Sequence, residues 1–296
     1  MAEKDLTEKI LLSYDDVFAD IVNGLVFEGK ERVKPSSLSD KIVHNQYKAD
    51  NDTLHEEERD IFKLWEECGI EIALCGLENQ TNPFRFMPAR IIGYDGASYR
   101  EQLLDTDRKK LLPVITLVLY FGMDHWNAPK NLKELFGEYP EELERYINDY
   151  KIHVFEIAWF SDEEIARFTG DFRIVANFFA KKRRNGGNYV PDDPQEIEHV
   201  DAVLKLLSVM SGDDSYRNLK ISGEGRKISM CDVAQNLIAQ GVAQGIVQGK
   251  AEGIAQGKAE EHRANIEKLA NNYLTTQAAK TKEEAVKMAE AILGKE

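Results

Sequence analysis

Apolar and polar positions alternate with several different periods along the first 185 residues, and each period predicts a different element. Between residues 10 and 25, apolar residues recur at spacings of three and four, the pattern of an amphipathic helix. The runs IFKLW and IEIALCGL, joined by EECG, are typical of a β-hairpin with a short turn that contains glycine. Residues 87–104 predict a helix interrupted by glycines, and the β-branched and aromatic run 113–122 predicts a strand covered on both faces.

The remaining segments predict one further strand and several helices. The polar stretch that ends at Arg59 indicates loop and surface helix, and a helical stretch is expected between the strand 113–122 and residue 150. KIHVFEIAWF, at 151–160, alternates as a strand. Helices are expected over 162–182, over 194–210 and from about residue 228. This order predicts an α/β fold with a small mixed β-sheet flanked by helices to residue 185, followed by an α-helical C-terminal region.

Glycine recurs with a strict period of four in the C-terminal region, at positions 241, 245, 249, 253 and 257. Five glycines cost an isolated helix roughly 4–5 kcal/mol relative to alanine. A helix is therefore expected here only if its line of glycines packs closely on another helix, such as the same helix of a second subunit. The alternative is a flexible linker before a last helix over 262–293. We divide the chain into 1–185, a helical extension 186–235 and the glycine-repeat tail 236–296, which is expected to form homo-oligomers.

Composition and charge narrow the classes of function. The 43% hydrophobic and 30% charged shares are those of an ordinary soluble globular protein, with neither a signal peptide nor a membrane-spanning run. Three scattered cysteines fit a reducing cytoplasm and form no zinc-binding pattern. The net charge of −14 argues against a large nucleic-acid-binding surface. The sequence also has no P-loop, no GxGxxG after a strand and no GxSxG.

The predicted hairpin brings two acids together at its open end. Its midpoint is Gly69, so antiparallel pairing sets Asp60 close to opposite Glu78, and Gln80 shares the face of Glu78. Two facing carboxylates repel unless a cation lies between them, and oxygen ligands of this kind suit Mg²⁺ or Mn²⁺. From geometry alone, two ordinary surface charges at the end of a hairpin remain the alternative.

Asp60 followed by Glu78-x-Gln80 resembles the core motif of the PD-(D/E)XK nuclease superfamily, in the variant with glutamine in place of the final lysine. The surrounding segments are similar to the Rpn family of recombination-promoting nucleases, also described as putative transposases of the YhgA-like type. The resembling segments, in chain order, are YDDVFADIVNGLVF, RDIFKLWEECGIEIALCGLENQT, MPARIIGYDGASYREQL, PVITLVLYFGMDHWN and YKIHVFEIAWFSDEEIARFTGDFRIVANFF. The glycine-repeat tail is also typical of that family.

The resemblance implies a restriction-endonuclease-like core and a metal-dependent DNA endonuclease. Asp60 and Glu78 would bind the ion, together with the main-chain carbonyl of Asn79, and Gln80 would orient the attacking water. An amide carries no positive charge, so a cation is expected from elsewhere, and Arg90, with Tyr94 one turn later, is the candidate. The alternative for Arg90 is a salt bridge or a helix cap.

Further residues could assist this site. Relatives of the core often add an acid from the first helix, where Asp16 and Asp20 share one face, although both could belong to a solvated surface. The basic run at 181–184 could contact DNA or form a solvated helix end, and its members are Lys181, Lys182, Arg183 and Arg184.

The sequence therefore predicts a cytoplasmic Mg²⁺-dependent DNA endonuclease associated with recombination or mobile elements. One alternative is a catalytically inactive DNA-binding or protein-interaction module that retains the nuclease fold. Another is a scaffold whose purpose is self-association through the glycine helix.

Overall fold

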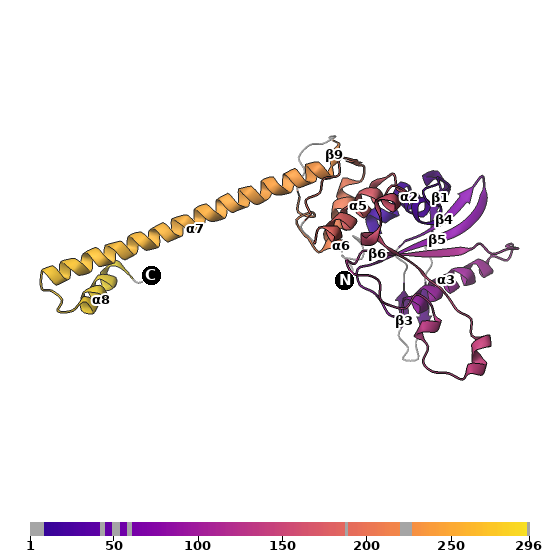
Figure 1. The fold of residues 1–296 in the computed structure, drawn as a ribbon, viewed down its shortest axis with the longest axis horizontal. Helices are drawn as coiled ribbons and strands as arrows, with labels where there is room; N and C mark the ends of the chain where they lie inside the picture. The colour runs from indigo at the N-terminus through magenta and orange to yellow at the C-terminus, as the bar shows by residue number, and fades with distance from the viewer. Residues whose placement is uncertain are drawn as a thin grey trace. The chain divides into compact units, whose positions relative to one another are not determined.

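The chain folds as two compact units. The computed structural model describes residues 9–41, 45–48, 54–57, 61–186, 189–219 and 227–294. One unit is Met1–Ala234 and the other is Gln235–Glu296. Figure 1 shows that the first unit holds the sheet with its helices and that the second is helical.

A mixed five-stranded sheet forms the centre of the first unit. Its strands lie in the order β1-β4-β5-β6-β7, with β5 in the middle. β5 pairs antiparallel with β4, which in turn pairs antiparallel with β1, whereas β5, β6 and β7 run parallel. The bounds are β1 Leu38–Asp40, β4 Ile61–Glu67, β5 Ile70–Gln80, β6 Val114–Tyr120 and β7 His153–Glu156. The predicted α/β class with a small mixed sheet is confirmed.

The β4–β5 hairpin turns tightly at Cys68 and Gly69. Both residues have positive φ, 54° and 75°, as a two-residue type I′ turn requires. The register places Ile61 opposite Leu77, so the pairing at this end of the hairpin is centred on Gly69 as the sequence predicts. A bulge between Trp65 and Glu66 shifts the register near the turn.

Helices cover the two faces of the sheet separately. α3 (Met87–Leu104) packs its Met87, Ile91 and Tyr94 against Val118 and Tyr120 of β6. On the opposite face lie α2 (Asp15–Val26) and α5 (Asp171–Arg184), as Figure 1 shows. Phe179 of α5 meets Phe121, which follows β6, at a ring-centroid distance of 5.1 Å.

A buried lysine ties α2 to the sheet. The side chain of Lys63 in β4 is 1% exposed, and its ammonium lies 2.7 Å from Asp15 of α2 and 2.6 Å from Asp40 of β1. It also lies 5.7 Å from the ring centroid of Phe18 in α2. The two acids are exposed to solvent and so lose little hydration, whereas the lysine would be costly to bury without them.

Several segments differ from the sequence predictions. The polar stretch before residue 59, expected as loop and helix, contains the strands β2 (Asn45–Lys48) and β3 (Leu54–Glu57), which pair with each other. Between β6 and β7 the expected α-helix is replaced by the short 3₁₀ helices Lys133–Leu135 and Glu141–Tyr146, because Pro129, Gly137 and Pro140 interrupt the chain. The strand expected over 151–160 ends at Glu156, where the 3₁₀ helix Ile157–Trp159 begins.

The helix expected over 162–182 is also divided. α4 is only Asp162–Ile165, and α5 begins at Asp171. The carboxylate of Asp20 accepts hydrogen bonds from the backbone N–H groups of Thr169, at 2.8 Å, and Gly170, at 3.1 Å. These groups precede the first turn of α5, so Asp20 acts as a cap supplied from another helix.

The C-terminal region is helical, as expected. α6 spans Val200–Ser211, α7 spans Met230–Thr275 and α8 spans Lys282–Leu293, while β8 (Glu196–Ile197) pairs with β9 (Ile228–Ser229). The glycine repeat lies inside the 46-residue α7, so the linker alternative is wrong for this segment. That alternative also placed the start of a last helix at residue 262. The helix instead continues to Thr275, and α8 then folds back on the end of α7. Their contact is made of Ala270, Ala279, Ala285 and Ala289.

Gly24 of α2 lies against the ring of Phe168, in the segment before α5. A Cβ at Gly24 would lie 2.2 Å from Cε1 of Phe168, whose ring is 2% exposed, whereas a Cβ at Gly96 of α3 would meet nothing within 4 Å. We therefore expect Gly24→Ala to destabilise the fold by about 1–3 kcal/mol, despite the better helix propensity of alanine. The matched Gly96→Ala should instead add roughly 0.5–1 kcal/mol. Urea unfolding of both variants tests this, and equal effects of the two would contradict the contact.

Candidate functional site

The candidate site lies where the central strand β5 ends. Glu78 pairs with Val118 of β6, and Gln80 pairs with Tyr120. Paired residues of neighbouring strands share a face, so Glu78 and Gln80 point to the face that α3 covers. The Glu78 side chain is buried, at 1% exposure, whereas Gln80 is half-buried. β5 thus ends with an acid and an amide on one face.

Asp60, the predicted partner of Glu78, lies outside the described residues. The neighbouring pair of the hairpin, Ile61 and Leu77, has the register on which that prediction depends. The metal-binding pair therefore stays a prediction, whose second member, Glu78, is placed by the structure.

Arg90 and Tyr94 lie one turn apart on α3, as the sequence predicts. The Arg90 Nε donates a hydrogen bond of 2.9 Å to the Tyr94 hydroxyl, and its guanidinium lies 5.7 Å from the Tyr94 ring centroid. Tyr94 packs in one cluster with Val118, the residue that pairs with Glu78. α3 therefore presents a half-buried guanidinium on the face of the sheet to which Glu78 points.

Asn79 projects to the opposite face because residues alternate along a strand. Its side chain is 5% exposed, and it pairs with Leu119 of β6. Only the main chain of Asn79 is thus available beside Glu78 and Gln80, which agrees with the role given to its carbonyl.

The two acids of the first helix belong to the other face of the sheet. Asp20 caps α5, and burial raises the pKa of its carboxyl while the hydrogen bonds from Thr169 and Gly170 act in the opposite sense. Asp16 lies 2.9 Å from Nε2 of His199. α2 packs on the face that carries Lys63, not on the face of Glu78. Both acids therefore have partners of their own, apart from the α3 face.

The basic run at the end of α5 is largely engaged within the protein. Lys181 pairs with Asp192 and Arg184 with Asp162, each at 2.6 Å. Arg183 donates to the carbonyl of Ala158 at 2.7 Å and stacks on Trp159, 3.9 Å from its ring centroid. Lys182 lies 5.7 Å from the ring centroid of Phe178. The run thus packs the end of α5 against its neighbours; Lys181, Lys182 and Arg183 are half-buried, and Arg184 is exposed.

One acid that the sequence did not predict for the site, Glu156, lies in the same row as Gln80. Gln80, Tyr120 and Glu156 pair consecutively across β5, β6 and β7, so their side chains share the α3 face. The Glu156 carboxylate accepts hydrogen bonds from the backbone of Trp126 at 3.2 Å and from Lys130 at 3.3 Å, and lies 2.7 Å from Nδ1 of His125. The available signal was the single acid inside the apolar run KIHVFEIAWF.

The pKa values of Tyr120 and Glu156 in this row depend on burial and on neighbouring groups. Burial alone would raise the pKa of Glu156, but its hydrogen bonds outweigh burial and hold the pKa below its ordinary value. Burial raises the pKa of the Tyr120 hydroxyl, and the charges of Asp124 and Glu156 add to that rise. At neutral pH this row therefore presents an amide, a neutral phenol and a carboxylate.

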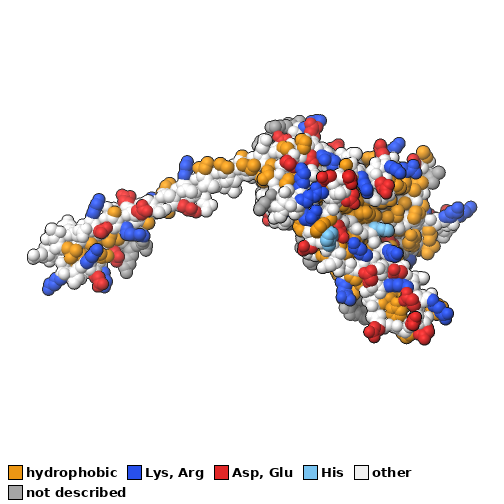
Figure 2. All heavy atoms as spheres, viewed as in Figure 1, with side chains coloured by type: hydrophobic (Ala, Val, Ile, Leu, Met, Phe, Trp, Pro, Cys, Tyr) orange, Lys and Arg blue, Asp and Glu red, His pale blue; other side chains and the backbone are white. Residues whose placement is uncertain are grey.

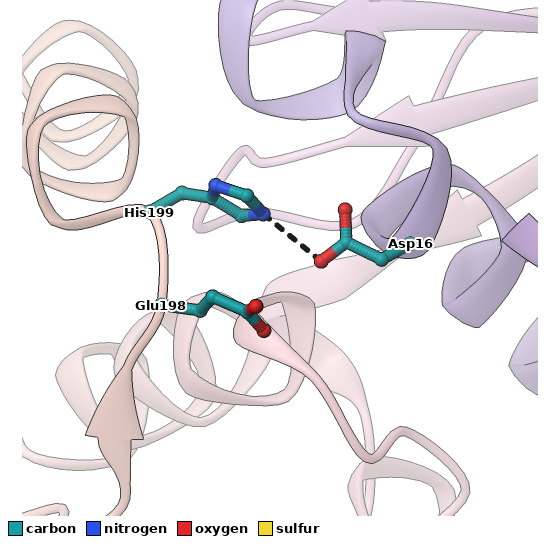
Figure 3. A group of neighbouring side chains, drawn as sticks. All are labelled: Asp16, Glu198 and His199. Atoms are coloured by element: carbon teal, nitrogen blue, oxygen red, sulfur yellow. Dashed lines mark hydrogen bonds and ion pairs between the residues drawn. The ribbon is translucent and has the colours of Figure 1, made fainter.

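A second group of polar side chains lies away from this edge. Asp16 of α2, Glu198 and His199 each offer a ligand atom, and these three atoms lie within 4.8 Å of one another. Figure 3 shows the imidazole of His199 directed at Asp16, with the carboxylate of Glu198 beside them. No local sequence pattern indicates this group, because 183 residues separate Asp16 from His199.

Within the part of the chain that the structure describes, no helix has the length and apolar character needed to cross a membrane.

Comparison with known families identifies the segment that contains the candidate site. Residues 61–190 match the family described as putative transposase, YhgA-like. Neither the curated proteins nor the solved structures give a match. The matched segment runs from β4 to beyond α5, and so includes Glu78, Gln80 and Arg90, but not Asp16. The resemblance seen in the sequence is thereby confirmed, and residues 61–190 carry the pattern of the putative transposase, YhgA-like, family.

Proposed function

We propose that this protein is a metal-dependent DNA endonuclease that hydrolyses phosphodiester bonds and acts in recombination or in a mobile element. The observation that carries the proposal is the placement of Glu78 and Gln80, two residues apart on one face at the carboxyl end of the central strand. The description of the matched family, a putative transposase, supports DNA as the substrate.

The donor atoms of this site suit a hard divalent cation. Glu78 offers a carboxylate, Asn79 a main-chain carbonyl, and Asp60 would complete the set. All three are oxygen donors, which Mg²⁺ and Mn²⁺ prefer. The 1% exposure of Glu78 adds to the fit, because a buried carboxylate is stabilised by a nearby positive charge. When bound, the ion would lower the pKa of a water and stabilise charge that develops on the phosphate.

Residues of this chain would supply the remaining steps. The Gln80 amide can accept a hydrogen bond from the attacking water and hold it in line with the scissile bond, but it cannot lower the pKa of that water. Arg90 carries the positive charge that glutamine lacks and can donate to a phosphate oxygen. Tyr94 restricts the guanidinium through its 2.9 Å hydrogen bond, so less side-chain entropy is lost when a phosphate binds.

DNA contact in the proposal relies on local positive charge, since the chain as a whole carries −14. Lys181, Arg183 and Arg184 already have partners within the protein, but Lys182 makes no ion pair within the described part of the chain. The same arrangement is also compatible with the alternative, a catalytically inactive DNA-binding or protein-interaction module with the same fold. Two features favour that alternative: Gln80 stands where the nuclease motif has a positively charged lysine, and the net charge of the chain is acidic.

Self-association through α7 is the second part of the proposal. Four apolar residues, Ile238, Val242, Ile246 and Ile254, are each more than half exposed. Each precedes a glycine of the repeat by three positions, so the apolar and glycine stripes are neighbours on the helix. A Cβ at any of the five glycines would meet nothing within 4 Å. Figure 2 shows the hydrophobic side chains that lie along this helix. A second copy of α7 fits this surface because its β-branched ridge could enter the glycine groove.

Replacing Glu78 by glutamine removes the charge while keeping the size of the side chain. We expect Glu78→Gln to reduce Mg²⁺-dependent plasmid nicking on the order of 10²-fold or more, because the carboxylate would hold the ion that stabilises charge at the reacting phosphate. The matched control is Glu66→Gln, which changes an exposed acid near the turn of the same hairpin. DNA binding without nicking by the wild type, over a range of divalent ions and at low salt, would favour the inactive alternative.

Arg90 can be tested separately from the metal ligands. We expect Arg90→Gln to lower the nicking rate about tenfold or more and Arg90→Lys to restore part of it, because the role requires positive charge. Tyr94→Phe removes the hydrogen bond that restricts Arg90 and should have the smaller effect. Single-turnover nicking at saturating Mg²⁺ measures all three, and equal rates for Arg90→Gln and the wild type would remove Arg90 from the site.

The glycine stripe has its own test. Alanine at all five glycines of the repeat should favour the helix by roughly 4–5 kcal/mol, yet convert the oligomer to monomers because the close approach is lost. The control places alanine at the exposed Gln244, Gln248 and Gln256 of the same helix. Sedimentation of the full chain measures the mass. A monomeric wild type, or an oligomer that survives in the glycine variant, would contradict the proposal.

A further inference from the structure

The group formed by Asp16, Glu198 and His199 has the geometry of a metal site that is separate from the one proposed at Glu78. Nε2 of His199 lies 2.9 Å from Oδ2 of Asp16. Two ligands at right angles, each about 2.1 Å from a shared ion, lie about 3.0 Å apart, and opposite ligands lie about 4.2 Å apart. All three ligand atoms lie within 4.8 Å of one another, so a small movement of the exposed Glu198 side chain would bring the set into range.

Neighbouring groups hold two of the three ligands in place. The carboxylate of Asp171 accepts the backbone N–H of Glu198 at 2.9 Å and that of His199 at 2.7 Å. The ring of Tyr14 stacks on the imidazole of His199, with a centroid distance of 3.8 Å and an interplanar angle of 13°. The imidazole is therefore oriented by contacts that do not depend on Asp16, as the supporting residues of metal ligands commonly do.

Charge at this group is not balanced by lysine or arginine. Neither Asp16 nor Glu198 forms an ion pair with either residue type within the described part of the chain. Asp171 and Asp20 add further carboxylates nearby, since Asp171 binds the backbone of Glu198 and Asp20 lies one turn from Asp16. A divalent cation would offset the repulsion between Asp16 and Glu198 more completely than protonation of His199 alone.

We infer that Asp16, Glu198 and His199 bind a divalent transition-metal ion, with water completing its coordination. One imidazole with two carboxylates suits Zn²⁺ or Mn²⁺ better than Mg²⁺ or Ca²⁺, which prefer oxygen ligands alone. Glu198 is exposed and the side chain of Asp16 is 42% exposed, so water can reach the ion. Such an ion links α2 to the residues that precede α6, two parts of the chain on either side of the family-matched segment.

Calorimetry on the full-length chain tests the inference, with Zn²⁺, Mn²⁺ and Mg²⁺ titrated in turn. We expect a Zn²⁺ site, distinct from the Mg²⁺ or Mn²⁺ site proposed at Glu78, whose Kd rises at least about tenfold in His199→Gln and in Glu198→Gln. Glu198→Gln changes an exposed side chain and so leaves the fold intact. The same variants should lose the rise in Tm that Zn²⁺ gives the wild type.

The controls separate this site from others. His125→Gln removes a histidine that also lies beside a carboxylate, Glu156 at 2.7 Å, and should leave the Kd unchanged. Glu78→Gln should also leave it unchanged, so that failure of the nuclease proposal and failure of this one are distinguishable. A Kd for Zn²⁺ and Mn²⁺ that is the same in the wild type, His199→Gln and Glu198→Gln would overturn the inference.

Discussion

The position of the candidate site follows from the pairing of β5, which is antiparallel to β4 and parallel to β6. An antiparallel partner can follow through a two-residue turn, but a parallel partner requires a crossover, which here contains α3. The crossover covers one face of β5, and alternation along the strand assigns Glu78 and Gln80 to that face. Arg90 is brought to the same face because it lies at the start of the crossover helix. One strand thus determines both the acid and the cation of the proposed chemistry.

The local sequence pattern was sufficient to predict the β4–β5 hairpin, β6 and the start of α3. The hairpin has a glycine turn, apolar strands and a register centred on Gly69, and each of these is encoded by residues close in sequence. β6 was predicted for a similar reason, since a continuous run of β-branched and aromatic residues is typical of a strand that is covered on both faces. Arg90 and Tyr94 followed from helical spacing alone. These elements are the ones in which local preference and tertiary environment agree.

Several predictions failed because distant residues decide the structure. The division between α4 and α5 depends on Asp20, which is 149 residues from Thr169 in sequence and supplies the cap. Its helical spacing with Asp16 suggested one shared role, but the two carboxylates have different partners. Glu156 was missed because its relation to Gln80 exists only once β5, β6 and β7 align. Periodicity carries no information about such pairs.

The face of the sheet on which each acid lies decides which acids could join Glu78 in the proposed catalytic site. Asp20 is held by the backbone of Thr169 and Gly170, and Asp16 is directed at His199, on the side of the sheet that α2 covers. Glu156, in contrast, shares a row with Gln80, and its neighbours hold the pKa of its carboxyl below the ordinary value. If a further acid assists Glu78, the sheet geometry therefore favours one from β7 over one from the first helix. In that case Lys130 and His125, both bound to Glu156, would also lie along the row from which Gln80 projects.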